Sequence, residues 1–180
     1  MSDAAILRDI LRVDHAGEAG AIRIYGAQIR VARLVAPDLL PMLRAALTDE
    51  IAHREAFENE MRHRGIVACH MLPFWWVGGA LLGFFTALLG RNAILTCTEA
   101  VERTVHRHMN DQIAWLEQHD MALMRVIAAI RDQEVDHLDK AVAVGGVRPR
   151  WLERLIAGTT EALVWLSTYG ASARLARALR

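Results

Sequence analysis

The chain has 180 residues, enough for one domain with a substantial hydrophobic core. Its 21 basic and 21 acidic residues give a formal net charge of zero, so bulk charge does not indicate a nucleic-acid partner. Cys69 and Cys97 match no metal-binding or disulfide framework, and charges interrupt the first residues too often for a secretory signal. We therefore expect a single domain, 1–180, that faces the bacterial cytosol or the inside of an organelle.

Two long amphipathic helices are predicted in the first half of the chain, over about 4–34 and 39–64. Apolar residues recur every three or four positions in both segments. Glu18 lies inside the apolar stripe of the first helix, and Glu50 and His53 lie inside that of the second. A carboxylate in an apolar stripe needs a partner, so these three residues are candidates for a buried polar site.

Other polar residues and glycines beside Glu18 suggest local roles. Gly17 and Gly20 predict that another helix or a ligand approaches the backbone closely there. Asp14 and His15 are candidates to orient a ligand, although His15 is equally well explained by packing. Asp38, between two prolines, is predicted to cap the second long helix.

A charge-free segment of twenty residues, 71–90, follows the second helix. Its length would suffice to span a bilayer, and Trp75 and Trp76 are of the type that gathers at membrane interfaces. A span would place the two halves of the chain, and their polar residues, on opposite sides of the membrane. We therefore expect a long hydrophobic crossover that lies in the interface, or dips in and returns, and its glycines would allow it to bend. The alternative is a crossover packed wholly on its own domain.

Two further amphipathic helices are predicted over 91–144, with Asn92 and Asp120 as their N-caps. No proline interrupts this part of the chain, which favours continuous helices. A fifth, C-terminal amphipathic helix is predicted from Trp151 onward. The sequence thus indicates an all-α protein, a four-helix bundle with a crossover between the second and third helices.

The polar residues inside the apolar stripes occur twice at a constant spacing. Adding 84 to 18, 50 and 53 gives 102, 134 and 137, so the full set is Glu18, Glu50, His53, Glu102, Glu134 and His137. An internal duplication of a two-helix unit, about 4–64 and 91–144, is the simplest source of this repeat.

This set of side chains predicts a metal centre. A Glu-x-x-His motif places both side chains on one face of a helix. Two such motifs, with one glutamate from each of two other helices, form the ligand set of di-iron or di-manganese carboxylate bundles. Four carboxylates offset the charge of two divalent ions, and oxygen and imidazole ligands suit iron and manganese. The alternative is that these residues are charged faces of an ordinary bundle.

Six short runs of the sequence carry a more specific pattern. They are Asp14-His15-Ala16-Gly17-Glu18, Glu50-x-x-His53, Thr86-Ala87-Leu88-Leu89-Gly90, Ala100-Val101-Glu102, Asn110-Asp111-Gln112-Ile113 and Arg131-Asp132-x-Glu134-x-x-His137. In this combination, from about residue 6 to 170, the chain resembles the 5-demethoxyubiquinone hydroxylases of ubiquinone biosynthesis.

The resemblance implies a ferritin-like domain with two iron ions held by the six residues of the repeat, with Glu50 and Glu134 as bridging ligands. The implied reaction is hydroxylation of the open ring carbon of 5-demethoxyubiquinol (3-demethoxyubiquinol) with dioxygen and electrons from NADH. The implied location is peripheral, on the cytoplasmic face of the bacterial inner membrane or the matrix face of the mitochondrial one. The implied partners are a quinone lipid and either a second copy or a lipid-binding protein.

The sequence departs from the family pattern at two positions, where Ala19 and Met109 stand in place of frequent tyrosines. Any role of those tyrosines is therefore in doubt here. Phe57, Tyr25 and Met109 are candidates to line the site, although core packing explains each as well. Two other functions stay open: a soluble ferritin-like protein that stores iron or removes peroxide, and a metal-free helical scaffold or integral membrane protein.

Overall fold

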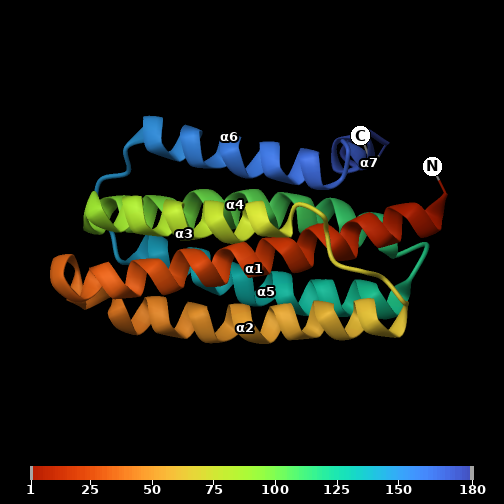
Figure 1. Cartoon of the computed structure of the whole chain (residues 1–180), viewed down its shortest axis with the longest axis horizontal. Coiled ribbons are helices and arrows are strands. Elements are labelled where there is room, and N and C mark those ends of the chain that lie inside the picture. The colour runs from red at the N-terminus through yellow and green to blue at the C-terminus, as the bar shows by residue number, and fades with distance from the viewer. Residues whose placement is uncertain (1, 179–180) are drawn as a thin grey trace.

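A computed structural model describes the backbone of residues 2–178 and the side chains as far as residue 176, and within this range the protein contains helices and no strands (Figure 1). The all-α prediction is thus confirmed. The helices are α1 (Asp3–Val35), the 3-10 turn η1 (Pro37–Leu39), α2 (Leu40–His63), α3 (Leu72–Leu88), α4 (Arg91–Leu116), α5 (Met121–Ala143), α6 (Arg150–Ser167) and α7 (Ala171–Ala178).

Two helical hairpins, α1–α2 and α4–α5, pack against each other, and two further helices cover them (Figure 1). The crossover helix α3 lies along α1, and α6 lies along α4. Each of the four hairpin helices contributes its apolar stripe to the interior. Burial of one such large apolar side chain stabilises a fold by about 1.5–3 kcal/mol, so these stripes fix which faces of the helices meet.

The interior consists of two main apolar clusters at successive levels of the bundle. One cluster includes Leu11, Phe57, Met109 and Ile130, and the other includes Tyr25, Ala46, Leu95 and Ala141. On every hairpin helix, the glutamate of the repeat lies between the residues of these two clusters in the sequence. The candidate site is therefore enclosed by apolar side chains above and below.

Of the three residues predicted to cap the N-termini of helices, one does so. Asp120 caps α5, because its Oδ1 accepts a hydrogen bond of 3.0 Å from the backbone N–H of Leu123. The prediction of Asn92 as a cap is wrong, because α4 begins one residue earlier, after Gly90 with a φ of 91°. The prediction for Asp38 is also wrong: this residue lies inside η1 and accepts a 2.8 Å hydrogen bond from Nε of Arg91.

The crossover contains one continuous helix, α3, which its glycines do not interrupt. Its glycines instead allow α3 to lie directly against α1. A Cβ atom on Gly79 would come within 2.4 Å of the carbonyl oxygen of Gly20, and one on Gly83 within 2.3 Å of that of Ile24. The close approach predicted at Gly20 is thus confirmed. Without side chains at these contacts, the two backbones pack closely.

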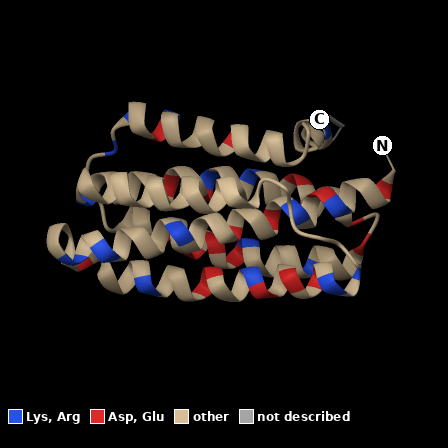
Figure 2. Cartoon of the chain, in the orientation of Figure 1, with Lys and Arg blue, Asp and Glu red and all other residues tan. Residues whose placement is uncertain are grey.

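The face of α3 that points away from α1 is apolar and exposed, so the crossover packs on the bundle by one face only. Phe74, Val77, Leu81, Phe85 and Leu88 are each more than half exposed. In contrast, α2 carries acidic and basic residues along its length (Figure 2). Among the described residues, we find no helix with both the length and the apolar character needed to cross a membrane.

The predicted fifth helix is divided into α6 and α7. Tyr169 and Gly170, with φ values of 49° and 76°, adopt left-handed backbone conformations that end α6. Near this break, Nε1 of Trp75 donates a 2.9 Å hydrogen bond to Oγ of Ser167. The end of α6 is thereby attached to the start of α3.

Candidate metal centre

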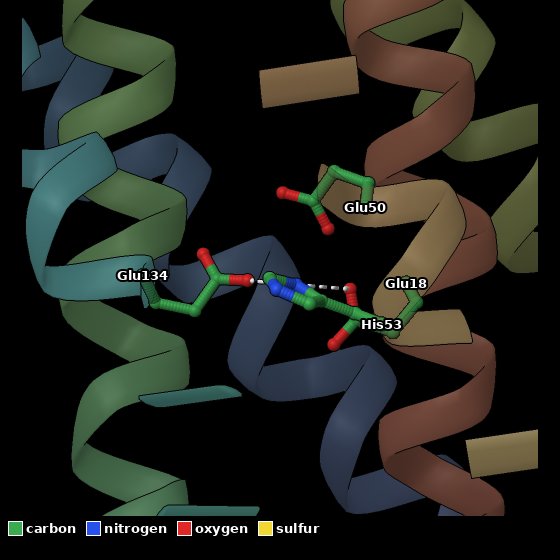
Figure 3. Close-up of side chains that lie close together, drawn as sticks. All are labelled: Glu18, Glu50, His53 and Glu134. Atoms are coloured by element: carbon green, nitrogen blue, oxygen red, sulfur yellow. Dashed lines mark ion pairs between the residues drawn. The ribbon is translucent and has the colours of Figure 1, made fainter. Parts of the chain in front are cut away.

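The six residues of the repeat meet in the middle of the bundle. Glu18 comes from α1, Glu50 and His53 from α2, Glu102 from α4, and Glu134 and His137 from α5. Each of these residues is at most 5% exposed. Their side chains point toward one another, as the four drawn in Figure 3 show. Residues 84 positions apart in the sequence therefore converge on one buried site.

The side chains form two overlapping groups suited to a pair of metal ions. One group consists of Glu18, Glu50, His53 and Glu134, and the other of Glu50, Glu102, Glu134 and His137. Within each group, one candidate ligand atom per residue lies within 4.8 Å of the others. Glu50 and Glu134 belong to both groups, the arrangement required of carboxylates that bridge two ions.

Both histidines direct Nδ1 toward the carboxylates. Nδ1 of His53 lies 2.8 Å from Oε1 of Glu134 and 3.9 Å from Oε2 of Glu18. Nδ1 of His137 lies 3.3 Å from Oε2 of Glu134 and 3.8 Å from Oε1 of Glu50. A metal ion bound among these carboxylates would therefore meet Nδ1 of each imidazole.

The other nitrogen of each histidine bonds to a residue of the opposite motif. Nε2 of His137 donates to Oδ2 of Asp49 at 3.0 Å, and Nε2 of His53 donates to Oε1 of Gln133 at 2.7 Å. Such bonds fix the orientation of a ligand imidazole and leave Nδ1 available for a metal. Neither residue is among those predicted from the sequence, although each directly precedes the glutamate of a Glu-x-x-His motif and the two are 84 positions apart.

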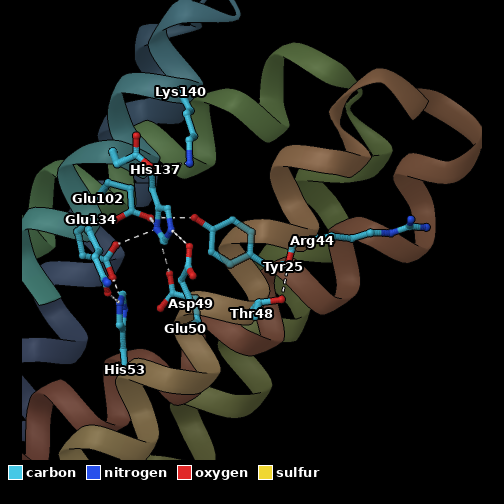
Figure 4. A network of polar contacts seen from close by, with 12 residues as sticks. Tyr25, Arg44, Thr48, Asp49, Glu50, His53, Glu102, Glu134, His137 and Lys140 are labelled. Atoms are coloured by element: carbon cyan, nitrogen blue, oxygen red, sulfur yellow. Dashed lines mark hydrogen bonds and ion pairs between the residues drawn. The ribbon is translucent and has the colours of Figure 1, made fainter.

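The orienting role considered for Asp14 and His15 is not observed. Oδ1 of Asp14 accepts a 2.8 Å hydrogen bond from Nε2 of Gln112, and no hydrogen bond satisfies the buried Nδ1 of His15. Tyr25 instead contacts a candidate ligand: its hydroxyl donates a 2.8 Å hydrogen bond to Oε1 of Glu102 (Figure 4). Of the other residues expected to line the site, Phe57 packs in the core, whereas Met109 contacts a cavity described below.

Burial dominates the electrostatics of the carboxylates. It raises the pKa of Glu18 to about 7, and together with the charge of Glu134 it raises those of Glu50 and Glu102 well above their ordinary values. Burial would also raise the pKa of Glu134, but the imidazoles of His137 and His53 beside it hold this pKa below its usual range. Burial therefore opposes ionisation of all four carboxylates at once unless positive charge lies beside them.

The two imidazoles respond to the carboxylates in the opposite direction. Burial would lower the pKa of His53, but the neighbouring Glu134 and Glu18 raise it to about 9. The pKa of His137 is likewise raised by Glu134 and Asp49 in spite of burial. Protons and metal ions thus compete for the same Nδ1 and carboxylate atoms, as at other metal sites.

The donor set fits two divalent ions. Four buried carboxylates carry four negative charges when ionised, which two divalent ions would neutralise without further residues. The buried Nδ1 of His53, despite its short distance to Glu134, has no hydrogen bond of acceptable geometry. Oxygen and imidazole ligands of this kind suit iron or manganese.

A cavity of about 480 Å³ leads from this cluster to the surface. Its inner wall includes Glu18 and Glu102, and most of its remaining lining is apolar. Its outer lining includes Leu81 of α3 and Trp151 and Leu155 of α6, which are 51%, 63% and 55% exposed. A ligand with a polar ring and an apolar tail matches such a cavity, because the polar atoms lie at its inner end.

Comparison with known proteins places the chain in a family. Residues 5–167 match the family model described as ubiquinone biosynthesis protein COQ7. The chain belongs to this family. The resemblance noted from the short motifs is thereby confirmed, and all six residues of the repeat lie within the matched region.

Curated COQ7 relatives come from animals, fungi and bacteria. The NADPH-dependent 3-demethoxyubiquinone 3-hydroxylase of Rattus norvegicus mitochondria is 35% identical over 91% of this chain and 77% of its own length. The 3-demethoxyubiquinol 3-hydroxylase of Rhodospirillum rubrum is 36% identical over 80% of this chain and 68% of its own length. The mitochondrial 5-demethoxyubiquinone hydroxylase of Saccharomyces cerevisiae is 35% identical over 78% of this chain and 67% of its own length.

Proposed function

We propose that this COQ7 protein is a ferritin-like di-iron monooxygenase that hydroxylates the ring of a demethoxyubiquinol during ubiquinone biosynthesis. The proposal is supported above all by one observation: six buried carboxylate and imidazole groups meet at the inner end of an apolar cavity. Membership of a family whose relatives are named as demethoxyubiquinone hydroxylases supports this substrate class.

The position of each residue determines which metal ion it would hold. Glu18 and His53 would hold one ion, Glu102 and His137 the other, and Glu50 and Glu134 would bridge them. Iron bound there would supply the redox chemistry of dioxygen, which amino-acid side chains lack. The apolar clusters on both sides exclude water from the reacting groups, which limits side reactions.

The cavity would orient the substrate by its polarity. The quinol ring would lie at the inner, carboxylate-lined end, and the isoprenoid tail would pass Leu81 and Trp151 toward the surface. Binding the tail in this way holds the ring carbon at a fixed place and converts an encounter between two molecules into a reaction within one complex.

The reductant in this proposal is NADH. The names of several relatives specify NADPH instead, so an assay must compare both nucleotides. No residue of this chain is assigned to nucleotide binding.

The protein would act as a peripheral protein on the membrane that contains the quinone. The exposed apolar face of α3 and the exposed Trp151 and Leu155 of α6 support this location, because the cavity reaches the surface between the same two helices. A second copy or a lipid-binding protein would be the partner that covers this apolar surface away from the membrane.

The proposal is tested by metal content and product formation together. Protein produced with iron is expected to contain two iron ions per chain, and with dioxygen and a reduced nicotinamide nucleotide to convert a demethoxyquinol into its hydroxylated product. Glu50→Ala, which removes a shared ligand, should lose both iron ions and all turnover. Glu58→Ala, an exposed change on the same helix, is the matched control and should retain both.

The outcomes separate this function from the alternatives. Fewer than about one iron per chain in the unaltered protein would reject the metal centre. Two irons with oxidation of ferrous iron or removal of peroxide, but with no quinol hydroxylation under any reductant, would favour iron storage or peroxide removal instead.

A further inference from the structure

The internal repeat relates the surroundings of the two halves of the site as well as the ligands. Adding 84 to the numbers of Glu18 and His53 gives Glu102 and His137, the corresponding ligands of the second half. The same operation relates Tyr25 to Met109 and Asp49 to Gln133. At these two pairs of positions the residue types differ, so the symmetry of the repeat is broken around the ligands.

The first break concerns the glutamates. Tyr25, on α1, donates a 2.8 Å hydrogen bond to Oε1 of Glu102, on α4. Its counterpart on α4 is Met109, which has no hydroxyl group to offer to Glu18 on α1. Both Tyr25 and Met109 are buried, at most 3% exposed, and Met109 lines the same cavity as Glu18. Glu102 is therefore held by a phenol, whereas the position related to Tyr25 by the repeat offers Glu18 no hydroxyl donor.

The second break concerns the histidines. His137 donates from Nε2 to the carboxylate of Asp49, whereas His53 donates to the neutral amide of Gln133. A hydrogen bond to a carboxylate is roughly twice as strong as one to a neutral acceptor and makes the imidazole a more basic ligand. Both differences favour the same half of the site, Glu102 with His137.

We propose that the chain holds its two metal ions unequally, with Tyr25 and Asp49 as positioning residues that make the Glu102–His137 half bind its ion more tightly than the Glu18–His53 half. The inference rests on the proposed di-iron centre and deepens it. Partners of this kind change metal affinity by about 10–100-fold when they are removed. Two of them on one half predict two separate binding steps.

The experiment is an anaerobic titration of the metal-free full-length chain with Fe²⁺, in competition with a coloured chelator. The unaltered protein is expected to bind two ions in steps that differ at least about tenfold in affinity. Tyr25→Phe and Asp49→Asn should each weaken the tighter step by about 10–100-fold and leave the weaker step unchanged. Mössbauer spectra of protein loaded with one equivalent of ⁵⁷Fe should show one dominant doublet, and Asp49→Asn should shift that doublet.

The positions related by the repeat provide matched controls. Met109→Leu, the counterpart of Tyr25→Phe, removes no hydrogen bond and should change neither step. Gln133→Glu gives His53 a carboxylate of the same length and should strengthen the weaker step, which narrows the gap between the two. Because this variant predicts a gain of affinity, it cannot be mimicked by a poorly folded protein.

Two equal steps in the unaltered chain would overturn the inference and leave the metal centre intact. The inference is also overturned, with the metal centre intact, if Tyr25→Phe and Asp49→Asn change the affinity of the weaker step or of neither step. If the unaltered chain binds no Fe²⁺ at all, the proposed metal centre itself fails.

Discussion

At the scale of single residues, the interior contains ionisable groups that only a specific partner makes tolerable. Each buried carboxylate of the candidate centre faces an imidazole, a phenol or another carboxylate. Asp14 is a further case: it lies one helical turn before Glu18 and contacts the same cavity. Its Oδ1 bonds to Gln112, whereas neither its Oδ2 nor Oε1 of Gln112 has a partner. A proton on Oδ2 of Asp14 would make this atom a hydrogen-bond donor, which is what an unpaired acceptor such as Oε1 of Gln112 requires.

The pH dependence of stability should reveal the protonated state of Asp14. Burial, with a smaller effect of Glu18, raises the pKa of Asp14 to about 8, although the bond from Gln112 opposes the shift. Because this folded-state pKa exceeds the ordinary value of 3.8, the contribution of Asp14 to stability is full below about pH 4 and is lost as the pH rises through 8.

Asp14→Asn keeps the shape of the side chain and the bond to Gln112 but has no proton to lose. Between pH 5 and pH 9, the unaltered protein should therefore lose more than ~1 kcal/mol of unfolding free energy relative to this variant. Urea denaturation at both pH values measures the difference, with the exposed Asp3→Asn as control. Parallel pH profiles of Asp14→Asn and the unaltered protein would show that Asp14 is ionised throughout.

At the scale of elements, the association of α3 with α1 depends on glycines that permit backbone contact. Residues 79 and 83 face α1 with no side chain between the helices, and a Cβ atom at either position would overlap a carbonyl oxygen. By contrast, Gly78 of the same helix has no atom within 4 Å of the place where its Cβ would lie. The three glycines of α3 are therefore not equivalent.

This contrast predicts opposite effects of the same substitution. Gly83→Ala should destabilise the protein by about 1–3 kcal/mol, because the helices must separate to admit the methyl group. Gly78→Ala should be neutral or stabilise it by up to ~1 kcal/mol, because alanine favours helix more than glycine does. Chemical denaturation of both variants tests the difference. Equal destabilisation by both would mean that close packing of α3 on α1 is not what these glycines provide.

At the scale of the whole molecule, apolar surface is concentrated where the cavity reaches the outside. The exposed side chains of α3 and α6 border its outer end, whereas α2 lies across α1 from α3 and carries charged residues along its length (Figures 1 and 2). A lipid surface placed against α3 and α6 would thus face the cavity directly.

Flotation with phospholipid vesicles tests this orientation. The unaltered protein should rise with the vesicles, and Phe74→Glu, on the exposed face of α3, should lower the vesicle affinity at least about tenfold, since insertion of a phenylalanine is worth about 1.5–3 kcal/mol. Ile51→Glu is the matched control, because Ile51 is 45% exposed on α2 and should not contact the lipid. Equal loss of binding in both variants, or no flotation of the unaltered chain, would reject a lipid-facing α3.

The sequence by itself determined the helical class, the long helices and the six residues of the candidate centre. Helical spacing decides which residues share a face, and a repeat at constant offset relates the two hairpins, so both features are encoded locally. Only the tertiary structure decided which residues support the ligands. Asp49, Gln133 and Tyr25 contact ligands on other helices, and no local spacing reports which helices lie side by side. The same limit explains the errors at Asp38 and Asn92, where packing between distant segments overrides the local preference of the chain.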